Sequence, residues 1–76
     1  MKEVLETLAK ALVDDPDSVS VTVIEEDDKT VLELRVAESD MGKVIGKQGR
    51  IAKAIRTVVK AAASHENKRA VVEIIG

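Results

Sequence analysis

The core of this chain must be built from aliphatic side chains alone, because the sequence contains no aromatic residue and no cysteine. A chain of 76 residues buries only a little over about 60% of its unfolded surface, so its core is modest. Without cysteine, neither a disulfide nor a thiolate metal site can support the fold. The composition, 45% hydrophobic and 34% charged, is nevertheless typical of a folded domain. We therefore expect a single domain over residues 1–76.

We expect no signal peptide at the amino terminus. Residues 1–10 lack the apolar stretch of a signal peptide. No unbroken apolar run is longer than three residues, far short of what a membrane span requires. A cytoplasmic location is therefore the default expectation.

The net charge of −2 hides a strong segregation of charge. Residues 1–40 hold four basic and twelve acidic residues, whereas residues 41–60 hold six cations and no acid. The six cations are Lys43, Lys47, Arg50, Lys53, Arg56 and Lys60. A face that serves only solubility normally mixes both signs. The basic segment therefore favours a polyanionic partner over a merely solvated surface.

Hydrophobic periodicity predicts six elements in the order α-β-β-α-α-β. They are a helix over residues 2–13, strands over 19–25 and 30–37, a short helix from an N-cap at Ser39 or Asp40 through Ile45, a helix over 50–63 and a strand over 69–75. The short link at 26–29 makes the first two strands an antiparallel hairpin. A helical crossover makes the third strand parallel to the second. The predicted fold class is α+β, a three-stranded mixed sheet with three helices on one face.

The stretch "VIGKQGRIAKAI" (44–55) places two glycines around a two-residue turn between helices. Glycine permits positive φ and close approach of another backbone, and the amino end of a helix suits a phosphate. Lys47 lies at the tip, with Lys43 and Arg50 on either side. The alternative is that Gly46 only ends a helix and Gly49 only relieves a tight turn.

The helix that follows this turn favours a binding site over a simple turn. At 100° per residue, its apolar half is predicted to hold Ile51, Ala54, Ile55, Val58, Val59 and Ala62. Its other half holds Arg50, Lys53, Arg56 and Lys60, and no acid occurs between residues 41 and 65.

A Walker A loop does not fit the glycine turn, because Met41 and Gln48 stand where that loop needs Gly and Ser or Thr.

The same stretch closely resembles the V-I-G-x-x-G-x-x-I signature of KH domains, which bind single-stranded nucleic acid. The element order resembles the type II, prokaryotic KH fold, over the whole chain, as in stand-alone bacterial KH proteins of the KhpA type. The resemblance implies a G-x-x-G loop that grips nucleic acid, made of Gly46, Lys47, Gln48 and Gly49. It also implies an aliphatic groove from Val36, Val44, Ile45 and Ile51, a short variable loop at about 64–69 and pairing with a second copy or a larger KH protein.

The sequence and the resemblance together predict a site for single-stranded RNA. The predicted RNA-binding residues are Lys43, Val44, Ile45, Gly46, Lys47, Gln48, Gly49, Arg50, Ile51 and Lys53. A wider set adds Val36, Arg56, Lys68 and Arg69. In this hypothesis cations meet phosphates, Gln48 meets phosphate or sugar, and the aliphatic residues border the floor for about four nucleotides.

Other classes of function find less support in the sequence. An enzyme needs a nucleophile–base pair or paired carboxylates in a pocket, and the serines have only His65 as a histidine partner. The cluster Asp14, Asp15 and Asp17 lacks calcium-loop spacing. We expect no catalysis, no cofactor and no metal. The remaining alternative is a structural KH module that assembles with proteins without contacting RNA.

Overall fold

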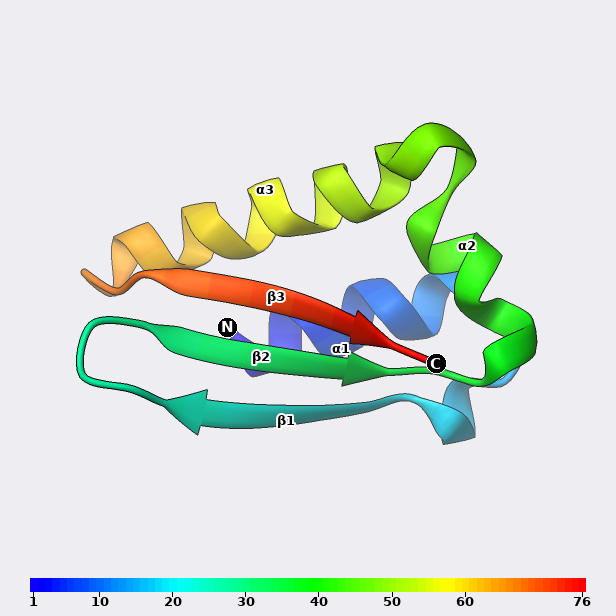
Figure 1. The fold of residues 1–76 in the computed structure, drawn as a ribbon, viewed down its shortest axis with the longest axis horizontal. Coiled ribbons are helices and arrows are strands. Elements are labelled where there is room, and N and C mark those ends of the chain that lie inside the picture. The colour runs from blue at the N-terminus through cyan, green and yellow to red at the C-terminus, as the bar shows by residue number, and fades with distance from the viewer.

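The computed structural model describes all 76 residues, and its elements follow the predicted order (Figure 1). The elements are α1 (Lys2–Leu12), β1 (Ser20–Glu25), β2 (Thr30–Arg35), α2 (Met41–Ile45), α3 (Arg50–His65) and β3 (Ala70–Ile75). Three short 3₁₀ turns lie at Pro16–Ser18, Glu38–Asp40 and Lys47–Gly49. The predicted boundaries differ by one or two residues, mostly because each strand is slightly shorter than its apolar run.

At its carboxyl end, α3 continues to His65 rather than stopping at Ala63. Asn67 takes a positive φ of 56°. The Asn67 N–H donates to the Ser64 carbonyl, and the Lys68 N–H donates to the Ala63 carbonyl. These two bonds form a Schellman motif, in which asparagine replaces the usual glycine.

The sheet has the order β1-β2-β3, so β2 is the central strand. β1 is antiparallel to β2, with Val23 opposite Leu32. β3 is parallel to β2, with Val72 opposite Leu32. α1 lies behind the sheet, and α3 runs beside β3 (Figure 1). The predicted three-stranded mixed sheet with helices on one face is therefore confirmed.

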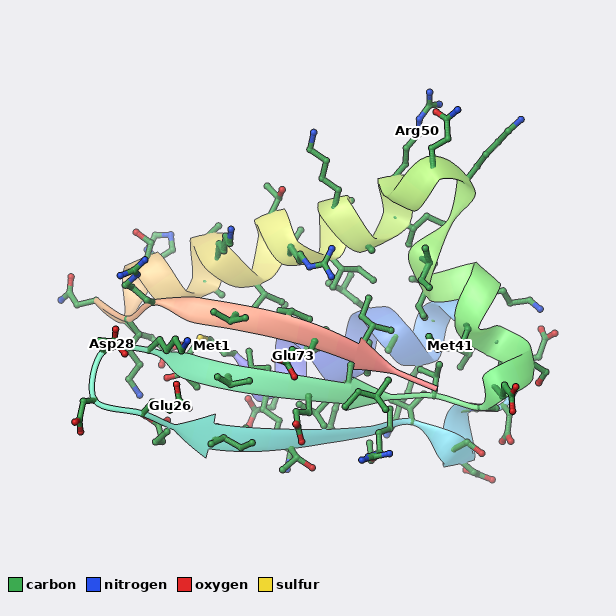
Figure 2. The ribbon with its side chains drawn as sticks, in the orientation of Figure 1. Met1, Glu26, Asp28, Met41, Arg50 and Glu73 are labelled. Atoms are coloured by element: carbon green, nitrogen blue, oxygen red, sulfur yellow. The ribbon has the colours of Figure 1, made fainter.

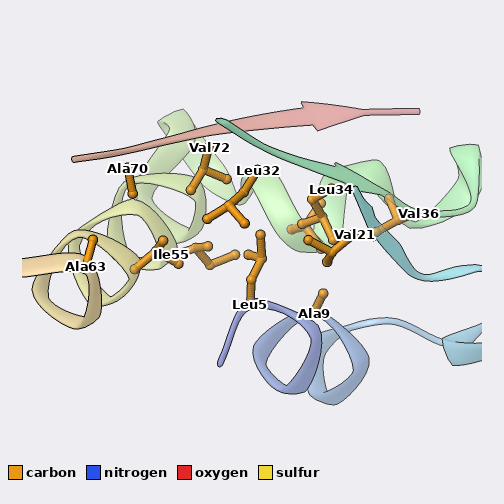
Figure 3. Close-up of a cluster of buried hydrophobic side chains, with 12 residues drawn as sticks. Leu5, Ala9, Val21, Leu32, Leu34, Val36, Ile55, Ala63, Ala70 and Val72 are labelled. Carbon is orange, nitrogen blue, oxygen red and sulfur yellow. The ribbon is translucent and has the colours of Figure 1, made fainter. Parts of the chain in front are cut away.

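The core is a single aliphatic cluster between the sheet and the helices (Figure 3). Its members are Leu5, Ala9, Val21, Leu32, Leu34, Val36, Val44, Ile55, Val59, Ala63, Ala70 and Val72. Leu5, Leu32 and Leu34 are fully buried, and burying such a side chain contributes about 1.5–3 kcal/mol. The small side chains of Ala9 on α1, Ala63 on α3 and Ala70 on β3 let the helices pack close to the sheet. No aromatic side chain is then needed to fill the space between them.

The buried stripe of α3 is not the predicted apolar half of its helical wheel. The buried positions are Ala52, Ile55, Val59 and Ala63. Ala54 is exposed, and Val58 is 44% exposed. The apolar half is wider than the area that the sheet and α1 can cover, so part of it stays outside the core. No helix in the structure is both long and apolar enough to cross a membrane.

Candidate nucleic-acid interface

Gly46, the first glycine of the turn, is required by the fold itself. It ends α2, and its N–H donates to the Gly42 carbonyl at 2.9 Å. Its φ of 75° and ψ of 173° fall in a region that is essentially restricted to glycine. A Cβ placed there would lie 2.5 Å from Ile51 Cγ1. The chain therefore turns tightly across Ile51, and Gly46 is more than the end of a helix.

Gly49, the second glycine, has a different environment. Its φ is 74° and its ψ is 13°, and apart from its two chain neighbours no residue comes within 4 Å of where its Cβ would be. Gln48 is also left-handed, with φ 58° and ψ 26°, which is uncommon for a residue other than glycine. The sequence predicted the two glycines but not this third left-handed position. The turn therefore has open space beside its backbone.

The side chains of the turn point into solvent. Lys47, Gln48 and Arg50 are all exposed, and Arg50 extends away from the sheet in Figure 2. Their only mutual contact is a long one, 3.5 Å from Arg50 Nη2 to Gln48 Oε1. No side chain caps the amino end of α3, and its first turn contains no acid. This end of α3 is positive through both its dipole and its side chains.

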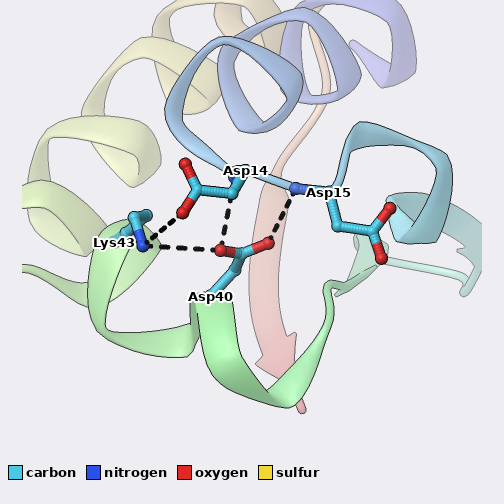
Figure 4. Close-up of polar contacts among 4 residues, drawn as sticks. All are labelled: Asp14, Asp15, Asp40 and Lys43. Carbon is cyan, nitrogen blue, oxygen red and sulfur yellow. Dashed lines mark hydrogen bonds and ion pairs between the residues drawn. The ribbon is translucent and has the colours of Figure 1, made fainter.

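Lys43 is less available than the sequence suggested. Its Nζ lies 3.0 Å from Asp14 Oδ2 and 3.6 Å from Asp40 Oδ1 (Figure 4). The hydrogen bond to Asp14 and the attraction of that carboxylate raise the pKa of Lys43 above its ordinary value of 10.5. A phosphate would have to compete with two carboxylates for this ammonium group. The predicted RNA contact of Lys43 would therefore weaken its ion pairs with Asp14 and Asp40.

Asp40 was predicted only as a helix cap, but it has a larger structural role. Its side chain is 2% exposed and makes no capping bond to α2. Instead it accepts hydrogen bonds from the Asp14 N–H at 3.3 Å and the Asp15 N–H at 3.1 Å. Burial pushes the pKa of Asp40 up, but these two donors and Lys43 outweigh burial and hold it below its ordinary value.

The contacts of Asp40 and Lys43 form a clamp, which we define as Asp14, Asp15, Asp40 and Lys43 (Figure 4). The clamp joins the segment after α1 to the start of α2. α2 leads directly into the glycine turn, so the clamp fixes the position from which the turn projects. The sequence signal for it was slight: one acid, Asp40, at the border between the acidic and basic segments.

The predicted aliphatic groove divides into buried and exposed residues. Val36 is 5% exposed and Val44 is fully buried, both within the core cluster. Neither side chain has surface to offer a nucleotide, so their predicted place in the groove needs correction: they support it from behind. Ile45 is 37% exposed and Ile51 is partly exposed. β2 cannot form the open wall, because it is the central strand.

The edge strand β3 lies beside the basic side of α3. Arg56 Nε donates to the Val72 carbonyl at 3.4 Å, which ties α3 to β3. Beside this contact is a hollow of about 430 Å³. It is lined by Lys29, Arg56, Lys60, Lys68, Arg69, Ala70, Val71 and Val72. We call it the basic hollow. The basic hollow brings together Arg56, Lys68 and Arg69 of the wider predicted set. Lys29 and Lys60 also line it, and the sequence did not predict them as site residues.

These features match one known family. The model for the KhpA/KhpB KH domain matches residues 2–74. The chain belongs to the KhpA/KhpB family of KH domains. Relatives named RNA-binding protein KhpA share 68% identity in Clostridium acetobutylicum and 64% in Clostridium perfringens, over 99% of this chain and the whole of each relative. The KhpA protein of Aquifex aeolicus is 51% identical over 99% of this chain and 95% of its own length.

A solved structure shares the fold of this KH domain. It is the crystal structure of Era in complex with MgGDPNP and nucleotides 1506–1542 of 16S ribosomal RNA. The TM-score is 0.68 at 22% identity, over 96% of this chain but only 28% of the Era chain. The likeness is one of fold, and it confirms the predicted type II KH arrangement.

Proposed function

We propose that this KH domain binds single-stranded RNA through the glycine turn and the adjacent basic side of α3, without catalysis. The observation that carries the proposal is the turn itself, where an uncapped helix end, open backbone at Gly49 and exposed cations face the same solvent region. The relatives named RNA-binding protein KhpA support it. The KH family is not an enzyme family. A cytoplasmic location remains a prediction.

In this mechanism the backbone phosphates lie against the turn. Gly49 lets the strand approach the main chain, while Lys47 and Arg50 supply charge-assisted hydrogen bonds. Lys53, one turn further along α3, continues the positive track. Ile45 and Ile51 offer apolar surface to sugars and bases, as expected for a KH groove holding about four nucleotides.

The proposal predicts a preference for unpaired strands. Bases must turn toward the protein to reach Ile45 and Ile51, and a duplex holds its bases stacked inside. We expect clearly tighter binding of a single-stranded oligoribonucleotide than of the matching duplex, titrated at one salt concentration because phosphate contacts depend on salt. Equal affinity would leave only a charged surface.

The turn itself is tested by changing Lys47→Asp and Gln48→Asp together. Aspartate tolerates the left-handed conformation of position 48, and acids near the amino end of a helix favour the fold. We expect thermal unfolding to stay near that of the parent, within about 0.5 kcal/mol, and RNA binding to be lost. Lys2→Asp with Thr7→Asp on α1 makes the same charge change on exposed positions away from the turn, and should bind RNA like the parent.

The alternative function, a protein-assembly module, is favoured by one specific surface. A hollow of about 300 Å³ lies between α1 and α3, and its lining is apolar except for Arg50. The apolar members are Leu8, Leu12, Ile51, Ala54, Ile55 and Val58. We call it the apolar groove. A second copy of this chain is the occupant we infer, because the same apolar surface on both copies satisfies two-fold symmetry.

The two proposed functions share only Arg50 and Ile51, and sedimentation analysis separates them. If the apolar groove pairs two copies, the weight-average mass should rise with concentration toward that of a dimer. Pairing would place two KH sites on one particle and raise affinity for a long RNA through effective concentration. A monomer at all concentrations that still binds RNA would reject the assembly role and keep RNA binding.

A further inference from the structure

The basic hollow has an unusual concentration of one sign of charge. Five cations line it from three segments of the chain, and no acid is among its lining residues. Arg56 and Lys60 come from α3, Lys68 and Arg69 from the loop that precedes β3, and Lys29 from the end of the β1–β2 turn. The floor is the aliphatic edge of β3, from Ala70 to Val72.

Most of this charge is unused within the protein. Arg56, Lys60 and Arg69 take part in none of the ion pairs of the structure. Lys68 makes only a 4.0 Å contact with Glu25. The guanidinium of Arg56 is anchored through Nε alone, which leaves its other four N–H donors available. Gathering like charges in this way works against the compact state, so a compensating polyanion is the natural ligand.

The acidic turn between β1 and β2 marks where the positive surface ends. Glu25, Glu26, Asp27 and Asp28 line an adjoining hollow that shares Lys29, Lys68 and Arg69 with the basic hollow. Figure 2 shows Glu26 and Asp28 at the opposite end of the molecule from Arg50. The positive track therefore runs from the glycine turn along α3 and stops at this acidic turn.

We propose that the basic hollow is a second phosphate-binding site for the same RNA strand, and that the acidic turn limits how far the strand extends. The inference rests on the proposed function. Arg50 and Lys60 are about 15 Å apart along α3 at 1.5 Å per residue, and Lys53 lies between them on the way. A strand held at the glycine turn thus reaches the hollow only when it extends beyond the nucleotides gripped there.

The hollow also offers a way to hold a base without an aromatic residue. The chain contains no Phe, Tyr or Trp, and RNA bases stack on arginine guanidinium planes as well as on aromatic rings. Arg56 presents such a plane, and its bond to the Val72 carbonyl restrains it beside the aliphatic edge of β3.

The test is a length series of oligouridylates, from about four nucleotides, the usual grip of a KH domain, to about three times that length. The basic-hollow variant is Lys29→Gln with Lys60→Gln, two lining residues of the hollow, and the control is Lys2→Gln with Lys10→Gln, an equal loss of charge elsewhere. The hollow variant should bind the shortest oligomer like the parent and the longest about tenfold more weakly. For the longest oligomer, the slope of log K against log salt concentration should become shallower by about 1.4, because the variant loses two cations and each phosphate contact contributes about 0.7.

A second variant tests the acidic turn. Glu25→Gln with Glu26→Gln removes the two carboxylates that contact Lys68 and Lys29. It should bind the longest oligomer several-fold more tightly than the parent, with no change for the shortest. Unchanged affinity for long oligomers in both this variant and the hollow variant would overturn the inference.

The outcomes keep the two proposals apart. If the Lys47→Asp, Gln48→Asp variant loses binding at every length while the hollow variant matches the parent, the glycine-turn site stands and the second site is rejected. If the parent binds no oligomer of the series, both proposals are overturned. Near-parental thermal unfolding of each variant confirms that affinity, and not folding, has changed.

Discussion

The two sides of α3 differ in almost every property, although they belong to one helix. The side toward β3 carries Lys53, Arg56 and Lys60 and borders the basic hollow. The side toward α1 carries Ala54 and Val58 and borders the apolar groove. The buried stripe of α3 runs between them. A polyanion and an apolar protein surface would therefore contact different sides of α3 and share only its first turn, where Arg50 and Ile51 line the apolar groove and also belong to the proposed RNA site.

This comparison teaches that α3 has three faces, where a helical wheel of apolar and basic halves suggests two. The basic half and the exposed part of the apolar half are both available to partners. RNA binding and self-association should therefore respond to different substitutions, and the following predictions test that separation.

The largest effect is expected from reversing charge on the basic side. Lys53→Glu with Lys60→Glu changes two exposed residues and replaces two cation–phosphate contacts by repulsion. Each charge-assisted hydrogen bond contributes about 1.5–3 kcal/mol, so affinity for a long single-stranded RNA should fall at least about a hundredfold. Fluorescence anisotropy measures this loss. The sedimentation profile should not change, and a change in both would show that the two sides are coupled.

The next effect concerns Gly46, which lies where the two sides of α3 begin. Gly46→Ala would force a Cβ against Ile51 of the apolar groove and require a glycine-only conformation. Such strain costs about 1–3 kcal/mol, and the clash adds to it. We expect a clear fall in the melting temperature.

Two other glycines are the controls for that substitution. Gly49→Ala meets no neighbouring atom and should cost about 1–2 kcal/mol for its left-handed backbone. Gly42→Ala lies inside α2 with open space around it and should be neutral or stabilising by about 0.4–1 kcal/mol. Equal melting temperatures for the alanine variants at 42 and 46 would contradict the close packing on Ile51.

A smaller effect is expected from the apolar side. Val58→Asp places a charge in the apolar groove without disturbing the core, since Val58 is the most exposed of the large apolar side chains. The dimer dissociation constant should rise at least about tenfold, from an unpaired charge at an apolar contact. Binding of a short RNA should stay at the parental value. Weaker short-RNA binding would mean that the groove and the glycine turn act together.

The sequence predicted the fold because its local signals agree. Strand alternation, the short hairpin link and the crossover leave one sheet topology, and the structure has it. The glycine turn was also predicted, because Gly46 and Gly49 stand next to a helix without acids. Each of these features depends on residues close together in the chain.

The parts that could not be predicted depend on residues far apart in the chain. Val44 and Val36 are apolar, but only the three-dimensional packing decides that they face the core rather than the groove. The basic hollow needs Lys29 beside Lys60, and no local pattern joins them. The partners of Asp40 likewise lie 25 and 26 residues earlier.

The smallest effect is the pH dependence of the clamp at Asp14, Asp15, Asp40 and Lys43, which fixes where both sides of α3 begin. The folded-state pKa of Asp40 lies below 3.8, so its stabilisation is complete above that value and is lost as pH falls through the folded pKa. The folded-state pKa of Lys43 lies above 10.5, so its stabilisation is complete below 10.5 and is lost at higher pH. Between these limits the clamp should hold unchanged.

Asp40→Asn removes the titrating carboxyl but keeps the size of the side chain, and thermal unfolding from neutral pH to below 3.8 measures its effect. The variant should melt at a lower temperature than the parent at neutral pH, and the difference between them should shrink as the parent's Asp40 is protonated. RNA binding and self-association should weaken together and only slightly, because Asp40 is buried and acts by holding the segment after α1 against the start of α2. Loss of RNA binding alone, with an unchanged melting temperature, would instead place Asp40 and Lys43 in the RNA site.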